Sequence, residues 1–272
     1  MDIIASVFLL LLLPLGFCNA HHDDGPGADN ESSVDGSTFE DATATILRMN
    51  NGSKDDLLEG DLIIPRTRTA MKCLSTVYSC LWPKSSHGNV EIPFILSEKY
   101  DISEKREILA AFKGIESQTC IRYIPRTNQV AYLNIEPKFG CSSLLGRVGD
   151  KQTLSLQRYG CISYGIIQHE LLHALGFYHE HTRSDRDKYV RINWENVHEY
   201  YVANFHKMDT DNLNIPYDYT SIMHYGRTAF GKNKAETITP THDPAAKIGE
   251  SMAISPIDVL RINKLYKCWN YL

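Results

Sequence analysis

The sequence predicts an α+β fold, because strands and a helix come first, a largely irregular stretch follows and a last helix closes the pattern. The first part alternates short β-branched and aromatic runs with two helical patterns. The stretch from about residue 176 to 250 is instead rich in Pro, Asn, Asp and Gly. The globular part, which starts at about residue 69, has the size of one large domain or two lobes.

The first strand is predicted at Val90–Leu96 ("VEIPFIL") and the first helix at Ser103–Ser117. Asp101 or Ser103 would cap this helix. Its spacing places three apolar side chains on one face, namely Ile108, Phe112 and Ile115.

Three short strands are predicted next, at "CIRYIP", "AYLNIE" and "TLSLQ". The run Ser163–Leu175 ("SYGIIQHELLHAL") predicts a helix that is buried on most sides. The last helix starts in "SPIDVLRINKLYKC", with Ser255 at the N-cap and Pro256 at the first helical position.

The first 20 residues are typical of a secretory signal peptide, which is cleaved after Ala20. Their apolar run, "IIASVFLLLLLPLGFC", is short for a membrane span and is interrupted by Pro14. No other stretch is apolar enough to anchor the chain in a membrane. The sequence therefore predicts a secreted protein.

Residues 21 to about 45 are acidic, rich in Gly and Ser, and too poor in apolar residues to fold alone. Residues 46–64 are more apolar, and the basic stretch "RTRTAMKC" then separates this head from the cysteine-bearing remainder. We expect the boundary between residues 21–68 and residues 69–272. Asn30 ("NES") and Asn51 ("NGS") are candidate glycosylation sites.

The charge and the cysteine content bear on nucleic-acid binding and on disulfide formation. The net charge is -5 and the Lys and Arg residues are dispersed, so no nucleic-acid-binding surface is indicated. Cys18 leaves with the signal peptide, and six cysteines remain, which in a secreted chain predict three disulfides. Spacing alone allows fifteen connectivities.

The stretch "HELLHALGFYHE" carries the chemistry. His169 and His173 lie four residues apart and share one face of a helix, with Glu170 beside them. His179 would lie about 15 Å further along a continuous helix. Gly176 can end the helix and return the chain, so that His179 reaches the same metal ion.

Three histidines leave one position open on a tetrahedral zinc ion, which is typical of catalytic sites. Zinc lowers the pKa of bound water and polarises a carbonyl, and Glu170 is placed to act as general base in amide hydrolysis. The alternatives are a buried helix with incidental histidines and a catalytically inactive extracellular binding domain that zinc only stabilises. Glu170 argues against the second, because a binding domain has no need of a base there.

A second motif, "SIMHYG", lies downstream and supplies a Met-turn candidate, Met223. Together with "HELLHALGFYHEHTRSDRD" it resembles the astacin family of metzincin zinc endopeptidases, from about Thr69 to Cys268. The resemblance implies two lobes. The N-terminal lobe would hold a mixed twisted sheet and two long helices, one with the zinc site, and the C-terminal lobe would be mostly irregular with a terminal helix.

The resemblance also implies roles for further residues. Glu180 would receive the N-terminus of the mature enzyme. Tyr225 would be an additional zinc ligand that swings away to stabilise the oxyanion. We expect His224 to be structural and His181 to be a neighbour of the site rather than a ligand.

The family carries a propeptide whose Gly-Asp pair reaches the zinc, and "EGDL" matches this pair at Gly60 and Asp61. Asp61 would occupy the position of the catalytic water and keep the enzyme latent. Activation would then cut near Arg66 or Arg68, by a trypsin-like protease or by the enzyme itself. Thr69 or Ala70 would be the first mature residue.

The disulfides implied by the resemblance are Cys120–Cys268, Cys141–Cys161 and an extra bridge, Cys73–Cys80. That extra pair resembles the fish hatching enzymes within the family, the low choriolytic type above all, although Thr69 stands where such enzymes tend to have Asn. The resemblance implies digestion of egg-envelope zona pellucida glycoproteins, after storage in secretory granules. The oligomeric state is open, with a monomer as the default. A nephrosin-like enzyme of blood-forming tissue is the alternative.

Overall fold

A computed structural model of the chain describes residues 41–54, 56–63 and 80–272. The expected signal peptide, Asn30, Cys73, the cleavage region at Arg66 and Arg68, and Thr69 lie outside the described residues. Within the part that is described, no helix is long and apolar enough to cross a membrane.

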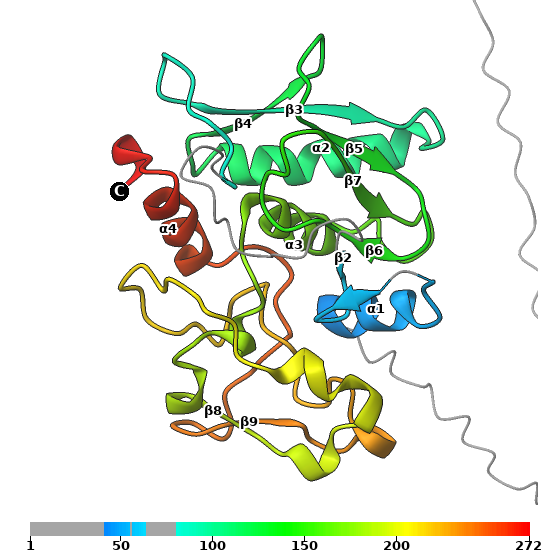
Figure 1. The fold of residues 1–272 in the computed structure, drawn as a ribbon, viewed down its shortest axis with the longest axis vertical. Coiled ribbons are helices and arrows are strands. Elements are labelled where there is room, and N and C mark those ends of the chain that lie inside the picture. The colour runs from blue at the N-terminus through cyan, green and yellow to red at the C-terminus, as the bar shows by residue number, and fades with distance from the viewer. Residues whose placement is uncertain (1–40, 55, 64–79) are drawn as a thin grey trace, which may run out of the picture. The chain divides into compact units, whose positions relative to one another are not determined.

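A five-stranded sheet forms the first half of the described structure, with the strand order β4-β3-β5-β7-β6 (Figure 1). Four strands are parallel, and the edge strand β6 runs antiparallel to β7, so the sheet is mixed as expected. The strands are β3 (Val90–Leu96), β4 (Ile121–Pro125), β5 (Tyr132–Glu136), β6 (Cys141–Ser142) and β7 (Lys151–Leu156).

Two helices pack together against this sheet, α2 (Ile102–Glu116) and α3 (Tyr164–Leu175). Asp101 begins α2 through a capping box, because its carboxylate accepts from the backbone N–H of Ser103 and of Glu104, whose side chain bonds back. Helix α3 is buried along almost its whole length, and this explains its apolar sequence on every side. Both helices lie within one residue of their predicted bounds.

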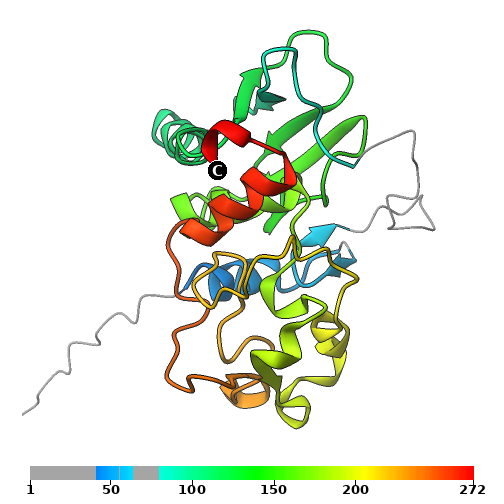
Figure 2. The same cartoon turned by 90° about the vertical axis from the view of Figure 1, so that its left-hand side faces the viewer.

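Helix α4 (Pro256–Leu265) begins at Ser255, which forms a capping box with Asp258. It packs against the core of the sheet and α3, as Figure 2 shows. The hydroxyl of Tyr266 donates to the backbone oxygen of Leu175, which fixes the end of α4 against the end of α3.

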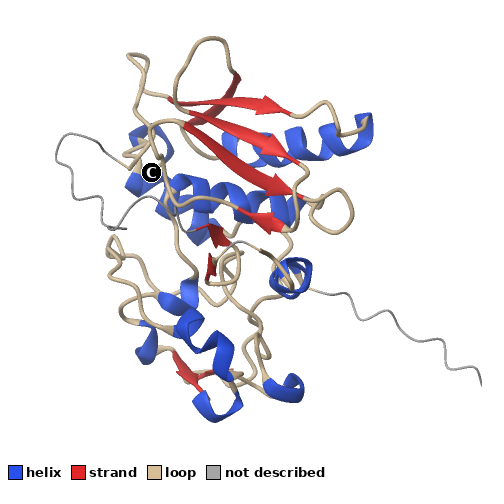
Figure 3. Ribbon diagram, turned by 45° about the vertical axis from the view of Figure 1, so that its right-hand side comes forward, coloured by secondary structure: helices blue, strands red, loops and turns tan. Residues whose placement is uncertain are grey.

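The second half of the described structure is largely irregular (Figure 3). Its two strands, β8 (Val190–Ile192) and β9 (Ile238–Pro240), pair antiparallel. A separate hydrophobic cluster that includes Phe205, Tyr217 and Tyr225 forms its core. The remaining elements are short 3₁₀ helices at Glu180–Thr182, Arg186–Lys188, Trp194–Asn196, Glu199–Phe205 and Lys232–Lys234, with another at the C-terminus, Trp269–Tyr271.

A short segment that precedes the expected domain boundary is also folded. It contains α1 (Ala42–Asn50) and the two-stranded sheet of β1 (Leu57–Leu58) and β2 (Leu62–Ile63). Helix α1 starts inside the stretch that we expected not to fold alone. It is stabilised by docking instead: Ile46 is fully buried, and the Thr43 hydroxyl donates to the backbone oxygen of His224.

Candidate active site

Three histidines converge in the buried centre of the described structure. The Nε2 atoms of His169 and His179 lie 3.1 Å apart, and all three side chains are fully buried. His169 and His173 come from one face of α3, as predicted. His179 follows the helix and returns to it.

Gly176 ends α3 and makes this return geometrically feasible. Its φ angle is 105°, in the left-handed region, and its N–H donates to the backbone oxygen of His173. The N–H of Phe177 donates to Leu172, which completes a Schellman-type helix end. The turn predicted from the glycine is therefore present.

Each histidine has a hydrogen-bond acceptor at Nδ1. Nδ1 of His169 lies 2.9 Å from the backbone oxygen of Ile222, and Nδ1 of His173 lies 2.7 Å from that of Phe177. For His179 the partner is a carboxylate oxygen of Glu59, at 2.7 Å. Since these oxygens accept, each Nδ1 carries a hydrogen, and Nε2 is the nitrogen that a neutral ring offers to a metal ion.

Asp61 from the head of the chain completes the cluster. One carboxylate oxygen lies 3.0 Å from Nε2 of His169 and 3.3 Å from Nε2 of His179, and the other lies 3.3 Å from Nε2 of His173. Burial alone would raise the pKa of Asp61, yet the neighbouring imidazoles hold that pKa well below its usual range. The carboxylate is therefore ionised.

The donor set fits a zinc ion. Four candidate ligand atoms, from Asp61, His169, His173 and His179, lie within 4.8 Å of one another. Among the described residues, neither Nε2 of His173 nor Oδ1 of Asp61 has a hydrogen-bond partner, although both are buried. Three imidazole nitrogens and one carboxylate are a tetrahedral set that zinc accepts, and such a metal would satisfy these atoms.

Glu170 lies in the turn of α3 that carries the histidines, and both its carboxylate oxygens are buried without a hydrogen-bond partner among the described residues. Burial, and next the negative charge of Asp61, raise the pKa of Glu170 well above its usual value. The side chain is therefore free to hold a proton within the site.

Tyr225 comes from the irregular half. Its hydroxyl donates to the backbone oxygen of Glu59, and its ring stacks on His181, with the ring centres 3.8 Å apart. His181 uses Nε2 on the backbone oxygen of Asn204 and stays outside the metal cluster. His224 bonds the Tyr217 hydroxyl at 2.7 Å, in keeping with a structural role.

Met223 and Glu180 are buried and joined by a backbone hydrogen bond. Met223 is buried in the core of the sheet region, and its backbone oxygen accepts from the N–H of Glu180. The Glu180 carboxylate is bound by both terminal nitrogens of Arg261, at 2.5 and 2.6 Å, and by Arg183 at 3.2 Å. Sequence reasoning assigned neither arginine to Glu180; Arg183 lies only three residues after it, whereas no spacing connects residue 261 to residue 180.

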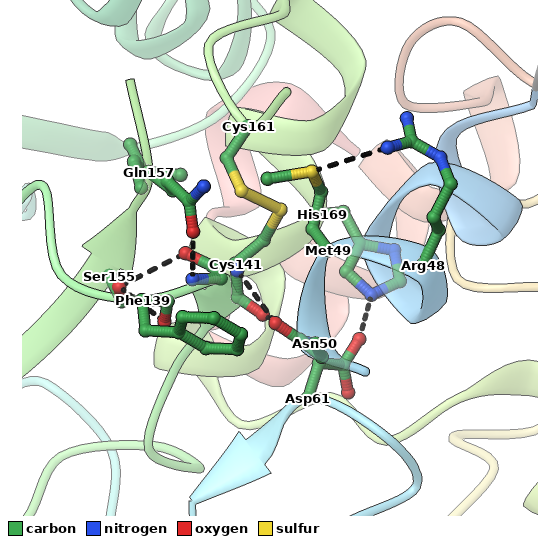
Figure 4. The surroundings of a disulfide bond; sticks show 12 residues. Arg48, Met49, Asn50, Asp61, Phe139, Cys141, Ser155, Gln157, Cys161 and His169 are labelled. Carbon is green, nitrogen blue, oxygen red and sulfur yellow. Dashed lines mark hydrogen bonds and ion pairs between the residues drawn. A yellow bond between two sulfur atoms is a disulfide. The ribbon is translucent and has the colours of Figure 1, made fainter. Parts of the chain in front are cut away.

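The head of the chain is held against the sheet edge by Asn50, another residue that sequence reasoning missed. Its amide nitrogen donates to the backbone oxygen of Cys141 at 2.6 Å, and its amide oxygen accepts from the Cys141 N–H at 2.9 Å. Figure 4 shows Asn50 beside the Cys141–Cys161 disulfide and Asp61 directed at His169. No motif in the sequence marks Asn50.

The described residues contain the disulfides Cys120–Cys268 and Cys141–Cys161, the two pairs that the resemblance implies. The first joins the start of β4 to the end of the chain, and the second joins β6 to the loop before α3. The bridge expected from Cys73 to Cys80 involves a residue outside the described part of the chain. Asn51 is exposed at the end of α1, so its sequon is accessible.

The family model of astacin, a family of peptidases, matches residues 80–267. The chain belongs to the astacin family. Among curated astacin-family relatives, the low choriolytic enzyme of Oryzias latipes is 56% identical over 98% of this chain and 100% of its own length. High choriolytic enzyme 1 of the same fish is 48% identical over the same shares.

A solved structure supports the same conclusion for the fold. That structure is high choriolytic enzyme 1 of medaka, described as a hatching enzyme zinc-protease. It is 52% identical, with a TM-score of 0.69, and the match covers 73% of this chain and 99% of that one. The prediction of an astacin-family zinc metallopeptidase that cleaves protein substrates is thus confirmed.

Proposed function

We propose that this astacin-family peptidase is secreted as a zymogen and digests egg-envelope glycoproteins at hatching. The observation that carries the zymogen proposal is Asp61, which lies among the three histidines of the site. The names of the relatives, low and high choriolytic enzyme, support the hatching role. Incubating isolated egg envelopes with the activated enzyme tests the substrate, and release of soluble glycopeptides is expected.

The chain would be divided into three segments. Residues 1–20 are the signal peptide, residues 21–68 the latency segment and residues 69–272 the peptidase. A trypsin-like protease or the enzyme itself cuts near Arg66 or Arg68, so that Thr69 or Ala70 becomes the first residue. We take the mature enzyme to be a monomer stored in secretory granules.

His169, His173 and His179 would hold the zinc through Nε2, because their Nδ1 atoms are already bonded. When bound, zinc supplies a Lewis acid that polarises the substrate carbonyl and lowers the pKa of water. Glu170 accepts the proton of the attacking water and delivers it to the leaving amine. Its unpartnered carboxylate supports this role, since no other side chain among the described residues competes for it.

Tyr225 would change partners on activation. In the described form its hydroxyl is bonded to Glu59, which leaves with the latency segment. The freed hydroxyl is then available as an additional zinc ligand and as a donor to the substrate oxyanion. Glu180 would receive the new N-terminus, and Met223 would support the site from the core, through its backbone bond to Glu180.

Latency follows from the placement of Asp61. Its carboxylate fills the space that water and substrate need, and the chain at Gly60 passes so close to Leu47 that a β-carbon there would lie 2.5 Å from it. The φ angle of Gly60 is 82°, which also favours glycine. A side chain at position 60 would therefore be disfavoured by the backbone angle and would press on Leu47 and Phe230.

The variant Glu170→Gln tests the catalytic role. We expect zinc to stay bound and proteolysis by the activated enzyme to fall by about 10²–10⁴-fold, because the amide cannot accept the proton. Chelation should abolish the wild-type activity, and added zinc should restore it. Full activity in Glu170→Gln would refute the mechanism.

The variant Asp61→Ala tests latency. We expect the uncleaved full chain to hydrolyse a peptide substrate, because the carboxylate no longer fills the site. The measurement needs a control with the cleavage region blocked, Arg66→Gln together with Arg68→Gln, so that activity cannot arise from processing. An uncleaved Asp61→Ala chain that remains silent would remove Asp61 from its role.

A further inference from the structure

Glu59 is fully buried, although it is an acidic residue on a short turn between β1 and β2. One of its carboxylate oxygens accepts two hydrogen bonds from the same residue, His179: Nδ1–H at 2.7 Å and the backbone N–H at 3.1 Å. A buried carboxylate is stable only with such partners. The contact therefore fixes both the ring and the backbone of the third histidine.

The three histidines differ in where their outer partners come from. His169 and His173 bond backbone oxygens of the peptidase part itself, at Ile222 and Phe177. Of the three Nδ1 atoms, only that of His179 bonds a residue of the segment that activation would remove. Cleavage would therefore leave the Nδ1 partners of two rings in place and remove the Nδ1 partner of the third.

The backbone of Glu59 is held as tightly as its side chain. Its N–H donates to the side-chain oxygen of Asn204 at 3.1 Å, and its carbonyl accepts from the Tyr225 hydroxyl. Its φ angle is 52°, a left-handed value that is uncommon for a residue with a β-carbon. The hydrogen bonds to Asn204 and Tyr225 hold the backbone of Glu59 in this left-handed conformation.

We propose that Glu59 is a positioning residue that orients the His179 ring and holds the Tyr225 hydroxyl by a hydrogen bond. As a result, the uncleaved chain would bind zinc more tightly than the cleaved one. This rests on the proposed function, which assigns the histidines as ligands and residues 21–68 as removable. A carboxylate on the outer nitrogen of a ligating imidazole fixes its tautomer and increases its basicity. Latency would then have two parts, Asp61 inside the site and Glu59 behind it.

The test is zinc affinity of the full chain, measured by competition with a chromophoric chelator. All variants carry Glu170→Gln, so that none can process itself. Glu59→Ala should bind zinc about 10–100-fold more weakly, the usual effect of losing such an outer partner. Asp56→Ala removes an exposed carboxylate from the same segment and should leave the affinity unchanged. The trypsin-cleaved chain should have about the same zinc affinity as an uncleaved chain that carries both Glu59→Ala and Asp61→Ala.

A second background separates Glu59 from Asp61. If Glu59 acted only by holding Asp61 in place, its removal would have no effect in an Asp61→Ala chain. Through His179 it should still weaken zinc binding about tenfold there. The visible spectrum of the cobalt-substituted chain should also change in Glu59→Ala, because it reports the ligand geometry.

The proposal fails if Glu59→Ala stays within about twofold of its parent in the Asp61→Ala background. Should Glu59→Ala not fold, Glu59→Gln decides, because its amide oxygen still accepts from Nδ1–H but lacks the charge. A loss of a few-fold in zinc affinity supports the proposal, and an unchanged affinity and cobalt spectrum overturn it. A wild-type chain that binds no zinc would instead refute the proposed function.

Discussion

The sheet region and the irregular region satisfy the hydrogen-bonding groups of their buried backbone in different ways. The sheet region, with α2 and α3, satisfies its polar backbone through strands and helices and fills its core with aliphatic side chains. The irregular region has the short β8–β9 pair as its sheet, and its backbone is satisfied by turns and loop-to-loop backbone bonds together with side chains. Buried or half-buried side chains that bond backbone oxygens there include Arg183, Arg186, Asn193, Arg227 and Thr237.

The site is built from residues of both regions. Helix α3 gives rigid placement to His169, His173 and Glu170, because every turn of it is packed. His179 and Tyr225 come from segments that helix or strand geometry does not fix. Under the proposed activation, Tyr225 would change partners in the region without regular structure, while His169, His173 and Glu170 would stay in place on the helix.

The largest stability effect should come from the core of the sheet. Leu133 on β5 is fully buried, and Leu133→Ala should lower the free energy of unfolding by about 2–5 kcal/mol, because a cavity forms among neighbours that cannot collapse. Denaturant unfolding measures this. Ile95→Ala on neighbouring β3 is the control, since Ile95 is 38% exposed and should cost much less. Equal losses would mean that the sheet core is not tightly packed.

A smaller effect is expected from Arg186 in the irregular region. Its guanidinium donates to the backbone oxygens of His181 and Phe205, at 2.8 and 2.9 Å. Arg186→Met keeps the apolar stem but leaves these oxygens unpaired, at a cost of about 2 kcal/mol. Arg186→Lys should recover part of that loss in the same unfolding experiment. A Met variant as stable as wild type would show that side-chain bonds do not hold this region together.

The smallest effect should come from the cap of α2. The N–H of Glu104, and next the Ser103 hydroxyl, lower the pKa of Asp101 to about 2. Asp101→Ala should lower the Tm at pH 6 by about 2 °C. Because the folded pKa lies below the unfolded one, the stabilisation is complete above about pH 4 and is lost as the pH falls towards 2. The Tm difference should therefore shrink over that interval, and a constant difference would contradict the charged cap.

The regular region could be predicted because its signals are periodic or local. The strand at Val90–Leu96 has its predicted bounds, and the caps at Asp101 and Ser255 are residues whose side chains favour that position. The pair β8–β9 and helix α1 were not predicted. Helix α1 is short and depends on docking, which a sequence without a partner surface does not reveal.

Some residues of the site could be predicted from the sequence and others could not. Helix spacing brings His169 and His173 together, and Gly176 ends the helix so that His179 can reach them. Tyr225 came only from the resemblance to the astacin family. Glu59 and Arg261 were missed, because their contacts with His179 and Glu180 join positions 120 and 81 residues apart. No local pattern encodes contacts over such distances.

The disulfide between Cys120 and Cys268 spans 148 residues and encloses α3, the whole irregular region and α4. A single peptide-bond cut anywhere inside that span leaves two pieces that remain one covalent molecule. For a protease surrounded by other copies of itself, a nick in an exposed loop therefore releases no fragment. The nicked enzyme would migrate as one band without reductant and as two bands with it.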